Sequence, residues 1–212
     1  MFFSEREVAN IPDVPKDTAT AAIAQAAVIG CGTMGGGISM NFLNVGIPVT
    51  VLEVDQEALD KGISVIKRNY DIQVQRGRMS EADVDKRMSL LTGTTDYKGL
   101  SSADVIIEAV YENIDVKVET FKKIEAVAKP GAILASNTSG LDIDKMAEAT
   151  GRPDAVIGLH FFSPANVMKL LEVVRGENTS KETIATSMKL GRTLNKIAVL
   201  SGNAPGFIGN RM

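Results

Sequence analysis

The sequence predicts an α/β fold in which a mostly parallel sheet is covered by helices on both faces. Two observations support this class. Short apolar runs alternate with longer amphipathic stretches from residue 26 onward, which is the pattern of repeated strand–helix units. The first apolar run also ends in a glycine-rich turn that leads into a helical stretch. The length of 212 residues fits one such domain, or one domain with a short annex.

The glycine-rich turn carries the most informative motif. Three glycines with the spacing GxGxxG follow the apolar run Ala26–Ile29, which predicts a buried strand. In a dinucleotide-binding turn, the first glycine permits the tight turn, the second lets a pyrophosphate approach the backbone, and the third lets the helix pack closely on the strand. The N–H groups at the helix start then face the phosphates. We therefore expect a Rossmann-like, doubly wound fold that binds a dinucleotide. The predicted contacts are Gly30, Gly32, Thr33, Met34 and Gly35.

An acid at the end of the second predicted strand, Val49–Glu53, indicates which dinucleotide binds. A carboxylate about 20 residues beyond the glycines can accept hydrogen bonds from the adenosine ribose, and it would repel a 2′-phosphate. Glu53 and Asp55 both lie near that position. We choose Glu53 because it directly follows the apolar run, whereas Asp55 suits the N-cap of the next helix. The expected cofactor is NAD rather than NADP.

The remaining elements follow in alternation. A Thr179–Glu182 capping box is expected to start the last helix. The predicted strands are Leu90–Thr94, Val105–Ala109, Ala132–Ser136, Val156–His160, Met168–Val174 and Lys196–Leu200, and the predicted helices are Ile38–Val45, Gln56–Arg76, Ser80–Arg87, Ile114–Ala128, Ile143–Ala149 and Ser180–Leu194.

Composition narrows the function classes. The chain is 44% hydrophobic and 23% charged, as is usual for globular proteins, and its net charge of −3 gives no indication of a nucleic-acid partner. No apolar run approaches the length of a membrane span, and no cluster of metal ligands stands out, so we expect no metal. A single cysteine, Cys31, excludes an internal disulfide and fits a reducing compartment. Its place at a helix start could lower its pKa, but we favour a small side chain packed in the turn.

The catalytic candidates follow predicted strands, because ligands of open α/β sheets bind beyond the carboxyl ends of the strands. His160, the only histidine, ends one strand. Its side chain titrates near neutral pH, as a general base must. Glu172 lies in the next apolar run and is suited to orient an imidazole; the alternative is a solvent-facing residue or a partner for Lys169. Ser136 and Ser139 could donate hydrogen bonds to a substrate oxygen, or form a polar turn.

Five segments together resemble the 3-hydroxyacyl-CoA dehydrogenases. They are VIGCGTMGGGI, EAVYENIDVK, ASNTSGL, GLHFFSPANVMKLLEVV and NAPGFIGNR, and they occur in the order of that family. The resemblance runs from about Ala26 to the end of the chain. The N-terminal FFSERE is similar to the link before this domain in multifunctional fatty-acid oxidation enzymes, and SP after HFF, instead of NP, is also similar to those enzymes. In those enzymes an enoyl-CoA hydratase part precedes the dehydrogenase.

The resemblance implies roles for individual residues. His160 matches the catalytic histidine, and Glu172 matches the glutamate paired with it. Glu53 stands where many relatives have Asp, and its longer carboxylate still reaches a ribose. Ser139 matches a substrate-contacting serine, Asn210 matches an active-site asparagine, and Glu112 and Lys117 match residues near the ribose and nicotinamide.

The implied reaction is NAD-dependent oxidation of an L-3-hydroxyacyl-CoA to the 3-ketoacyl-CoA in β-oxidation. Residues 1–24 are expected to form a linker, 25–205 the NAD-binding domain, and 206–212 the start of the family's C-terminal helical domain, which is absent here. We expect an acyl-CoA substrate, an enoyl-CoA hydratase domain in the same parent chain, and a bacterial cytoplasmic location. Because chain ends fray, we do not expect the side chain of Asn210 to be held in place.

Two alternatives remain open. The chain could be an NAD(H)-binding module with little or no turnover. It could also resemble a hydroxyacid dehydrogenase of a related Rossmann group, which uses a lysine base on the helix after a strand. His160 together with Glu172 argues against that second alternative.

Overall fold

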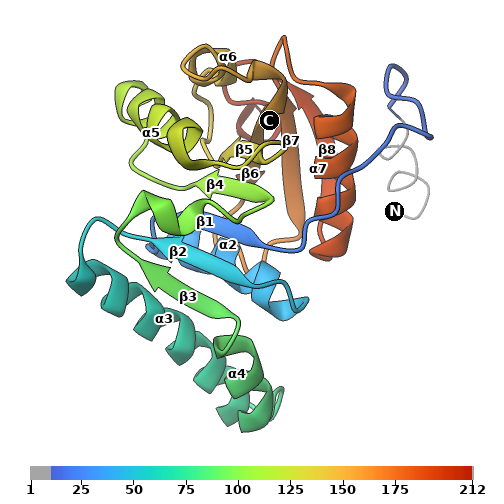
Figure 1. Cartoon of the computed structure of the whole chain (residues 1–212). Coiled ribbons are helices and arrows are strands. Elements are labelled where there is room, and N and C mark those ends of the chain that lie inside the picture. Colours follow the sequence, from blue (N-terminus) through green and yellow to red (C-terminus); the bar gives the residue numbers. More distant parts are fainter. Residues whose placement is uncertain (1–10, 212) are drawn as a thin grey trace.

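The computed structural model describes residues 11–211 as one eight-stranded sheet with helices on both faces (Figure 1). The strands are β1 (Ala26–Ile29), β2 (Val49–Leu52), β3 (Leu91–Thr94), β4 (Val105–Glu108), β5 (Ile133–Ser136), β6 (Val156–Phe161), β7 (Leu170–Arg175) and β8 (Ile197–Gly202). The helices are α2 (Thr33–Asn44), α3 (Gln56–Gln75), α4 (Glu81–Met88), α5 (Ile114–Val127), α6 (Ile143–Ala147) and α7 (Lys181–Thr193). Short 3₁₀ helices lie at Tyr97–Leu100, Pro153–Ala155 and Gly209–Arg211.

The strand order is β3-β2-β1-β4-β5-β6-β7-β8. Strands β1 to β6 are parallel to one another, β7 is antiparallel to β6, and β8 is parallel to β7. The chain thus leaves β1 toward β2 on one side and returns to β4 on the other. Such a reversal of strand order creates a crevice at the carboxyl ends of the strands, where ligands of doubly wound folds bind. The predicted α/β, Rossmann-like class is confirmed.

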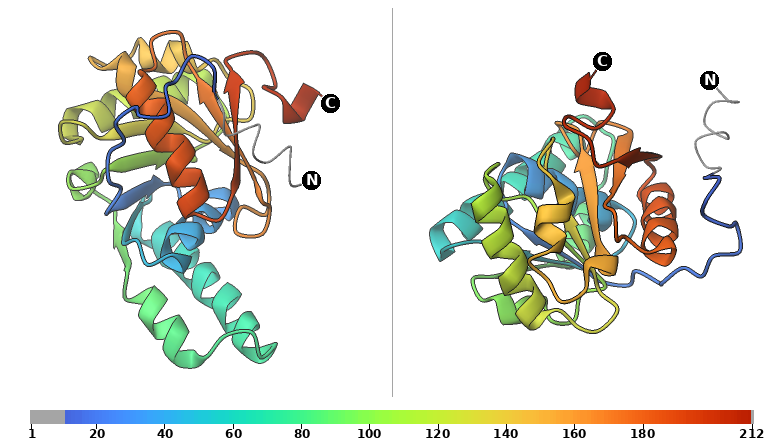
Figure 2. Two further views of the ribbon diagram at one scale, coloured as in Figure 1. Left: turned by 90° about the vertical axis from the view of Figure 1, so that its right-hand side faces the viewer. Right: turned by 90° about the horizontal axis from the view of Figure 1, so that it is seen from above.

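Each face of the sheet has its own hydrophobic core. Ala26 and Val28 of β1 pack with the cluster that includes helices α2, α3 and α7, whereas Ala27 and Ile29 pack with the cluster that includes α5 and α6. Both views in Figure 2 show helices on the two sides of the sheet. Because central parallel strands are covered on both faces, their sequences are continuous apolar runs rather than alternating ones. Short apolar runs in the sequence therefore mark the central strands.

Helix caps show which side chains start each helix. Asp55 accepts a hydrogen bond from Ala58 N at 2.8 Å, which confirms it as the N-cap of α3. The α3–α4 pair extends from the body of the molecule below β3 (Figure 1). The capping box expected at Thr179 and Glu182 is wrong, because Ser180 is the N-cap of α7. Thr179 instead donates to Val156 O at 2.7 Å, so its hydroxyl ties the segment before α7 to β6.

The part of the predicted linker from residue 11 onward runs alongside α7 (Figure 2). Ala21 N donates to Thr186 Oγ1 at 3.0 Å, and Arg175 forms an ion pair with Asp13 at 2.6 Å. Residues 1–10, which include the FFSERE segment, and residue 212 lie outside the described residues. Among the helices that the structure describes, none is both long and apolar enough to cross a bilayer.

Candidate cofactor and catalytic site

The glycine turn has the geometry of a phosphate-binding loop. Gly30 has φ +89°, a conformation that favours glycine. A Cβ on Gly35 would lie 1.8 Å from Gly30 O, so only glycine lets α2 approach β1 this closely. Gly32 is the N-cap of α2, no side chain caps that helix end, and nothing lies within 4 Å of where a Gly32 Cβ would be. The open space and the uncapped N–H groups fit a pyrophosphate.

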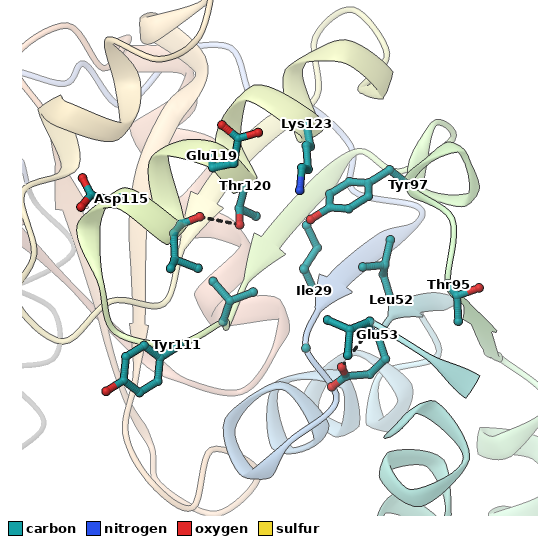
Figure 3. A pocket seen from close by; sticks show the side chains of 14 residues that line it. Ile29, Leu52, Glu53, Thr95, Tyr97, Tyr111, Asp115, Glu119, Thr120 and Lys123 are labelled. Carbon is teal, nitrogen blue, oxygen red and sulfur yellow. Dashed lines mark hydrogen bonds between the residues drawn. The ribbon is translucent and has the colours of Figure 1, made fainter. Parts of the chain in front are cut away.

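A cleft of about 700 Å³ opens beside this turn, between the ends of β1, β2 and β4 and the side of α5 (Figure 3). Glu53 lies at the glycine-turn end, where its Oε1 accepts from Cys31 N at 2.6 Å. Tyr97 and Lys123 line the opposite side. Sequence reasoning identified Glu53 but not these wall residues, which come from separate segments. An apolar-lined cleft of this size fits an adenosine moiety, with Glu53 available to its ribose.

Cys31 is buried beneath the same turn, and burial followed by the charge of Glu53 raises the pKa of its thiol to about 11. The alternative of a reactive cysteine with a lowered pKa is therefore wrong. The favoured interpretation, a small side chain packed in the turn, agrees with its contact with Gly62 of α3, where any added Cβ would lie 2.5 Å from the sulfur.

A second cleft of about 310 Å³ adjoins the first, and Val110 lines both. Four predicted site residues from different elements meet at this second cleft. Asn137 and the segment from Phe161 to Ser163, which sequence reasoning did not select as site residues, complete its wall. The four predicted residues are Met34, Glu112, Ser139 and His160.

His160 and Glu172 form a buried pair at this cleft. They are directly opposite each other in the antiparallel register of β6 and β7, and His160 Nδ1 lies 2.7 Å from Glu172 Oε2. A carboxylate accepts hydrogen bonds, so Nδ1 is the donor of this pair, and in the neutral imidazole Nε2 has the free lone pair. Glu172 is 1% exposed, which rules out the solvent-facing alternative. The arrangement therefore presents an oriented imidazole that can accept a proton at Nε2.

The C-terminal segment is tied to the same carboxylate. Glu172 Oε1 accepts from Ile208 N at 3.0 Å and from Gly209 N at 2.8 Å, and Phe207 is buried. Asn210 Nδ2 donates to Ser139 O at 2.9 Å. The expectation that Asn210 would not be held in place is therefore wrong for this structure. The buried ring of Phe207 and the buried carboxylate of Glu172 anchor the residues next to Asn210. The position of Asn210 near the end of the sequence gave no indication of these contacts.

Glu112 organises the loop after β5. Its Oε1 accepts from Thr138 Oγ1 at 2.6 Å, from Ser139 N at 2.7 Å and from Ser139 Oγ at 2.9 Å. Burial by itself would raise the pKa of Glu112, but these hydrogen bonds and the charge of Lys117 outweigh burial and hold that pKa below its ordinary value. Glu112 is thus ionised near neutral pH, and it holds the Ser139 hydroxyl at the cleft.

Lys117 lies behind Glu112 and is 1% exposed. Its Nζ lies 2.9 and 2.8 Å from the two oxygens of Glu108 and 3.3 Å from Glu112 Oε2. Ser136 also donates to Glu108, and it is fully buried, so the expectation that Ser136 contacts a substrate is wrong. Sequence reasoning missed Glu108; an acid inside the apolar strand Val105–Ala109 was the available signal.

Comparison with known proteins gives the family of the chain. Residues 25–204 match the family model described as 3-hydroxyacyl-CoA dehydrogenase, NAD binding domain. A peroxisomal fatty acid beta-oxidation multifunctional protein of Arabidopsis thaliana is 42% identical over 212 residues, which is 100% of this chain and 29% of that protein. The fatty acid oxidation complex subunit alpha of Psychrobacter arcticus is 40% identical over 190 residues, which is 90% of this chain and 26% of that protein.

Among solved structures, (S)-3-hydroxybutyryl-CoA dehydrogenase from Ralstonia eutropha matches with a TM-score of 0.88 and 37% identity, over 90% of this chain and 68% of that one. The chain spans less than a third of the length of the plant and bacterial relatives described above. The glycine turn, the two clefts and the family match agree with one another. The chain belongs to the NAD-binding domain family of the 3-hydroxyacyl-CoA dehydrogenases.

Proposed function

We propose that this chain supplies the cofactor site and the proton-transfer residues for NAD-dependent oxidation of an L-3-hydroxyacyl-CoA to the 3-ketoacyl-CoA in β-oxidation. The observation that carries the proposal is the His160–Glu172 pair, held 2.7 Å apart beside a cleft that adjoins the dinucleotide cleft. A base next to a nicotinamide cofactor suits removal of a hydroxyl proton together with a hydride from the same carbon.

Each residue has a distinct part in the proposed reaction. His160 Nε2 accepts the proton of the C3 hydroxyl, and Glu172 stabilises the imidazolium that forms. Ser139 and Asn210, which are hydrogen-bonded to each other through Ser139 O, orient the substrate oxygen. NAD, when bound, accepts the hydride. The glycine turn holds the pyrophosphate and Glu53 holds the adenosine ribose.

A lysine-based mechanism has less support. Lys117 is on the helix after β4, as the alternative of a related hydroxyacid dehydrogenase requires. Its Nζ is enclosed by two carboxylates and is not directed at the cleft as a free base. The second candidate function is therefore an NAD(H)-binding module with little turnover. The family model that residues 25–204 match is described as an NAD binding domain, which supports this candidate.

The names of the relatives bear on partners and location. Because a matched relative is a multifunctional protein, we propose that the parent chain also carries an enoyl-CoA hydratase domain. The matched relatives include a peroxisomal protein and a bacterial subunit, and a bacterial cytoplasmic location stays a prediction.

The test uses the parent gene, expressed from residue 1 through the C-terminal helical domain that the family resemblance implies. His160→Gln is expected to lower kcat for 3-hydroxybutyryl-CoA by roughly 10²–10⁴-fold, the usual effect of losing a positioned general base. The Kd of NADH should stay the same. Glu182→Gln, on the exposed face of α7, serves as a control with unchanged kcat. Near-full activity of the His160 variant would refute the proposed base.

A further inference from the structure

A buried group of charges lies behind the second cleft, at the end of β4 and the start of α5. We call it the β4–α5 charge cluster, and it consists of Glu108, Lys117 and Glu112. Lys117 Nζ lies 2.8 Å from Glu108 Oε2 and 3.3 Å from Glu112 Oε2. The proposed reaction gives Glu108 no role, although it is fully buried in a strand whose other residues are apolar.

The hydrogen-bond partners of Glu108 are all donors, which is the environment that a carboxylate requires. Oε1 accepts from Lys117 Nζ and from the Ser136 hydroxyl, and Oε2 accepts from Lys117 Nζ and from Val110 N at 3.1 Å. Four hydrogen bonds from three donor groups, one of them the Lys117 ammonium, favour the ionised form of a carboxyl group. A buried ion pair is seldom needed for stability alone, since apolar side chains of similar volume often stabilise a core as well.

The charge of the cluster follows from this composition. Lys117 and Glu112 by themselves would be neutral, and Glu108 brings the net charge of the cluster to −1. Only Glu112 opens onto the second cleft, since its side chain is 40% exposed and that of Lys117 is 1% exposed. The cluster therefore presents a carboxylate and an excess negative charge to the cleft, while its cation stays enclosed.

A negative charge near the nicotinamide interacts differently with its oxidised and reduced forms. The oxidised ring carries a positive charge and the reduced ring is neutral, whereas the pyrophosphate and both riboses are the same in the two forms. We propose that Glu108 tilts the cofactor preference of this site toward NAD⁺ relative to NADH, by making the β4–α5 charge cluster net negative. The inference rests on the proposed function, because it needs the nicotinamide at the cleft that Glu112 lines.

The measurement is the ratio of two dissociation constants, Kd for NAD⁺ divided by Kd for NADH, from calorimetry on the 212-residue chain. Glu108→Gln keeps the shape of the side chain and makes the cluster neutral. The ratio should rise by about three- to tenfold, the effect of one charge at a partly solvated site. Lys117→Gln removes the cation of the cluster, so the ratio should not rise: the net charge stays at −1 if Glu108 takes up a proton without its partner and becomes −2 if it does not.

The double variant Glu108→Gln with Lys117→Gln separates charge from structure. It restores a net charge of −1 while removing the ion pair, so its ratio should return to near that of the parent chain even if both affinities fall. Glu125→Gln is the matched control, since Glu125 is also an ion-paired acid on α5 but lies at the far end of the helix, 2.9 Å from Arg152. Its ratio should not change.

Three outcomes overturn the inference. A folded Glu108→Gln variant with an unchanged ratio would show that its charge does not reach the nicotinamide. Equal loss of affinity for both forms would show that Glu108 only supports the local structure. Failure of the parent chain to bind either form would remove the proposed function as well. If Glu108→Gln does not fold, Glu112→Gln gives the same neutral cluster and should also raise the ratio; an unchanged ratio would overturn the inference.

Discussion

His160 and Glu172 lie directly opposite each other on the antiparallel strands β6 and β7, with Nδ1 and Oε2 2.7 Å apart. The other carboxylate oxygen accepts hydrogen bonds from Ile208 N and Gly209 N. One buried carboxylate thus orients the imidazole and also anchors the segment that carries Asn210. Substitution of Glu172 therefore tests whether this carboxylate supports catalysis through His160.

Glu172→Gln should lower kcat in the extended protein by about 10- to 100-fold, less than the loss expected for His160→Gln. A Gln side chain leaves the imidazolium without a counter-charge, and its amide can favour the wrong tautomer. Steady-state kinetics with 3-hydroxybutyryl-CoA gives kcat, and an NADH titration gives the affinity, which should not change. A kcat equal to that of the parent protein would mean that Glu172 does not act through His160.

Two glycines of the turn should respond differently to the same substitution. Gly35→Ala should destabilise the fold by more than about 3 kcal/mol, because its Cβ would lie 1.8 Å from a carbonyl oxygen that cannot move away. Gly32→Ala should fold normally, because nothing lies near its Cβ, but it should weaken NADH binding by filling the space for the pyrophosphate. Urea unfolding and NADH titration separate the two effects. Equal stability of both variants would contradict this account of the turn.

Glu53 should determine the preference for NADH over NADPH. Glu53→Ala should narrow the difference between the two affinities, because the carboxylate that repels a 2′-phosphate is removed. Asp55→Asn is the matched control, since it removes a nearby charge and keeps a side chain that can cap α3. It should change the ratio of affinities much less. Equal or tighter binding of NADPH by the parent chain would show that Glu53 does not select the cofactor.

Cys31 should contribute a pH dependence to stability. Burial raises the pKa of its thiol in the fold from 9.0 to about 11. Between these values the unfolded thiol loses its proton while the folded thiol keeps it. The contribution of Cys31 to the free energy of unfolding is therefore constant below pH 9 and falls as the pH rises from 9 to 11, by up to about 1.4 kcal/mol per pH unit.

Denaturant unfolding of the parent chain and of Cys31→Ala at several pH values measures this contribution. The pKa of Tyr70 is also raised by burial, to about 12, but that effect is common to both proteins and cancels in their difference. The stability difference between them should shrink or reverse above pH 9. A difference that is independent of pH up to 11 would mean that the thiol ionises equally well in both states.

The 212-residue chain should bind NADH but oxidise 3-hydroxybutyryl-CoA at least about 100-fold slower than the extended protein, a deficit of roughly 2.7 kcal/mol. The glycine turn and Glu53 lie within the described sheet, so cofactor binding needs no further domain. Water that reaches the cleft at His160 weakens the charge interactions there, and we expect the helical domain to exclude it. NADH production by both proteins at matched folded concentration gives kcat/KM. Comparable values would show that this domain is sufficient for turnover.

The local elements were predictable because they depend on near neighbours in the chain. The β1 strand and the glycine turn follow from an apolar run and a fixed spacing of glycines, and the role of Asp55 as a cap follows from its place before a helix. The expected Thr179 cap failed because a contact distant in sequence, from its hydroxyl to Val156 O, competes for that side chain. Such competition depends on where β6 lies and is not encoded in the local pattern.

The sequence by itself determined the fold class and the family, since alternation of apolar runs and the glycine spacing are properties of the order of residues. His160 and Glu172 could also be selected from it, as polar residues at strand positions. Only the tertiary structure decided the partners of the other polar residues. It enclosed Ser136 with Glu108, placed Lys117 between two carboxylates and held Asn210 against Ser139. The physical reason is that a hydrogen bond or an ion pair needs groups within a few ångströms, and these groups come close only when the strands, helices and loops that carry them pack together.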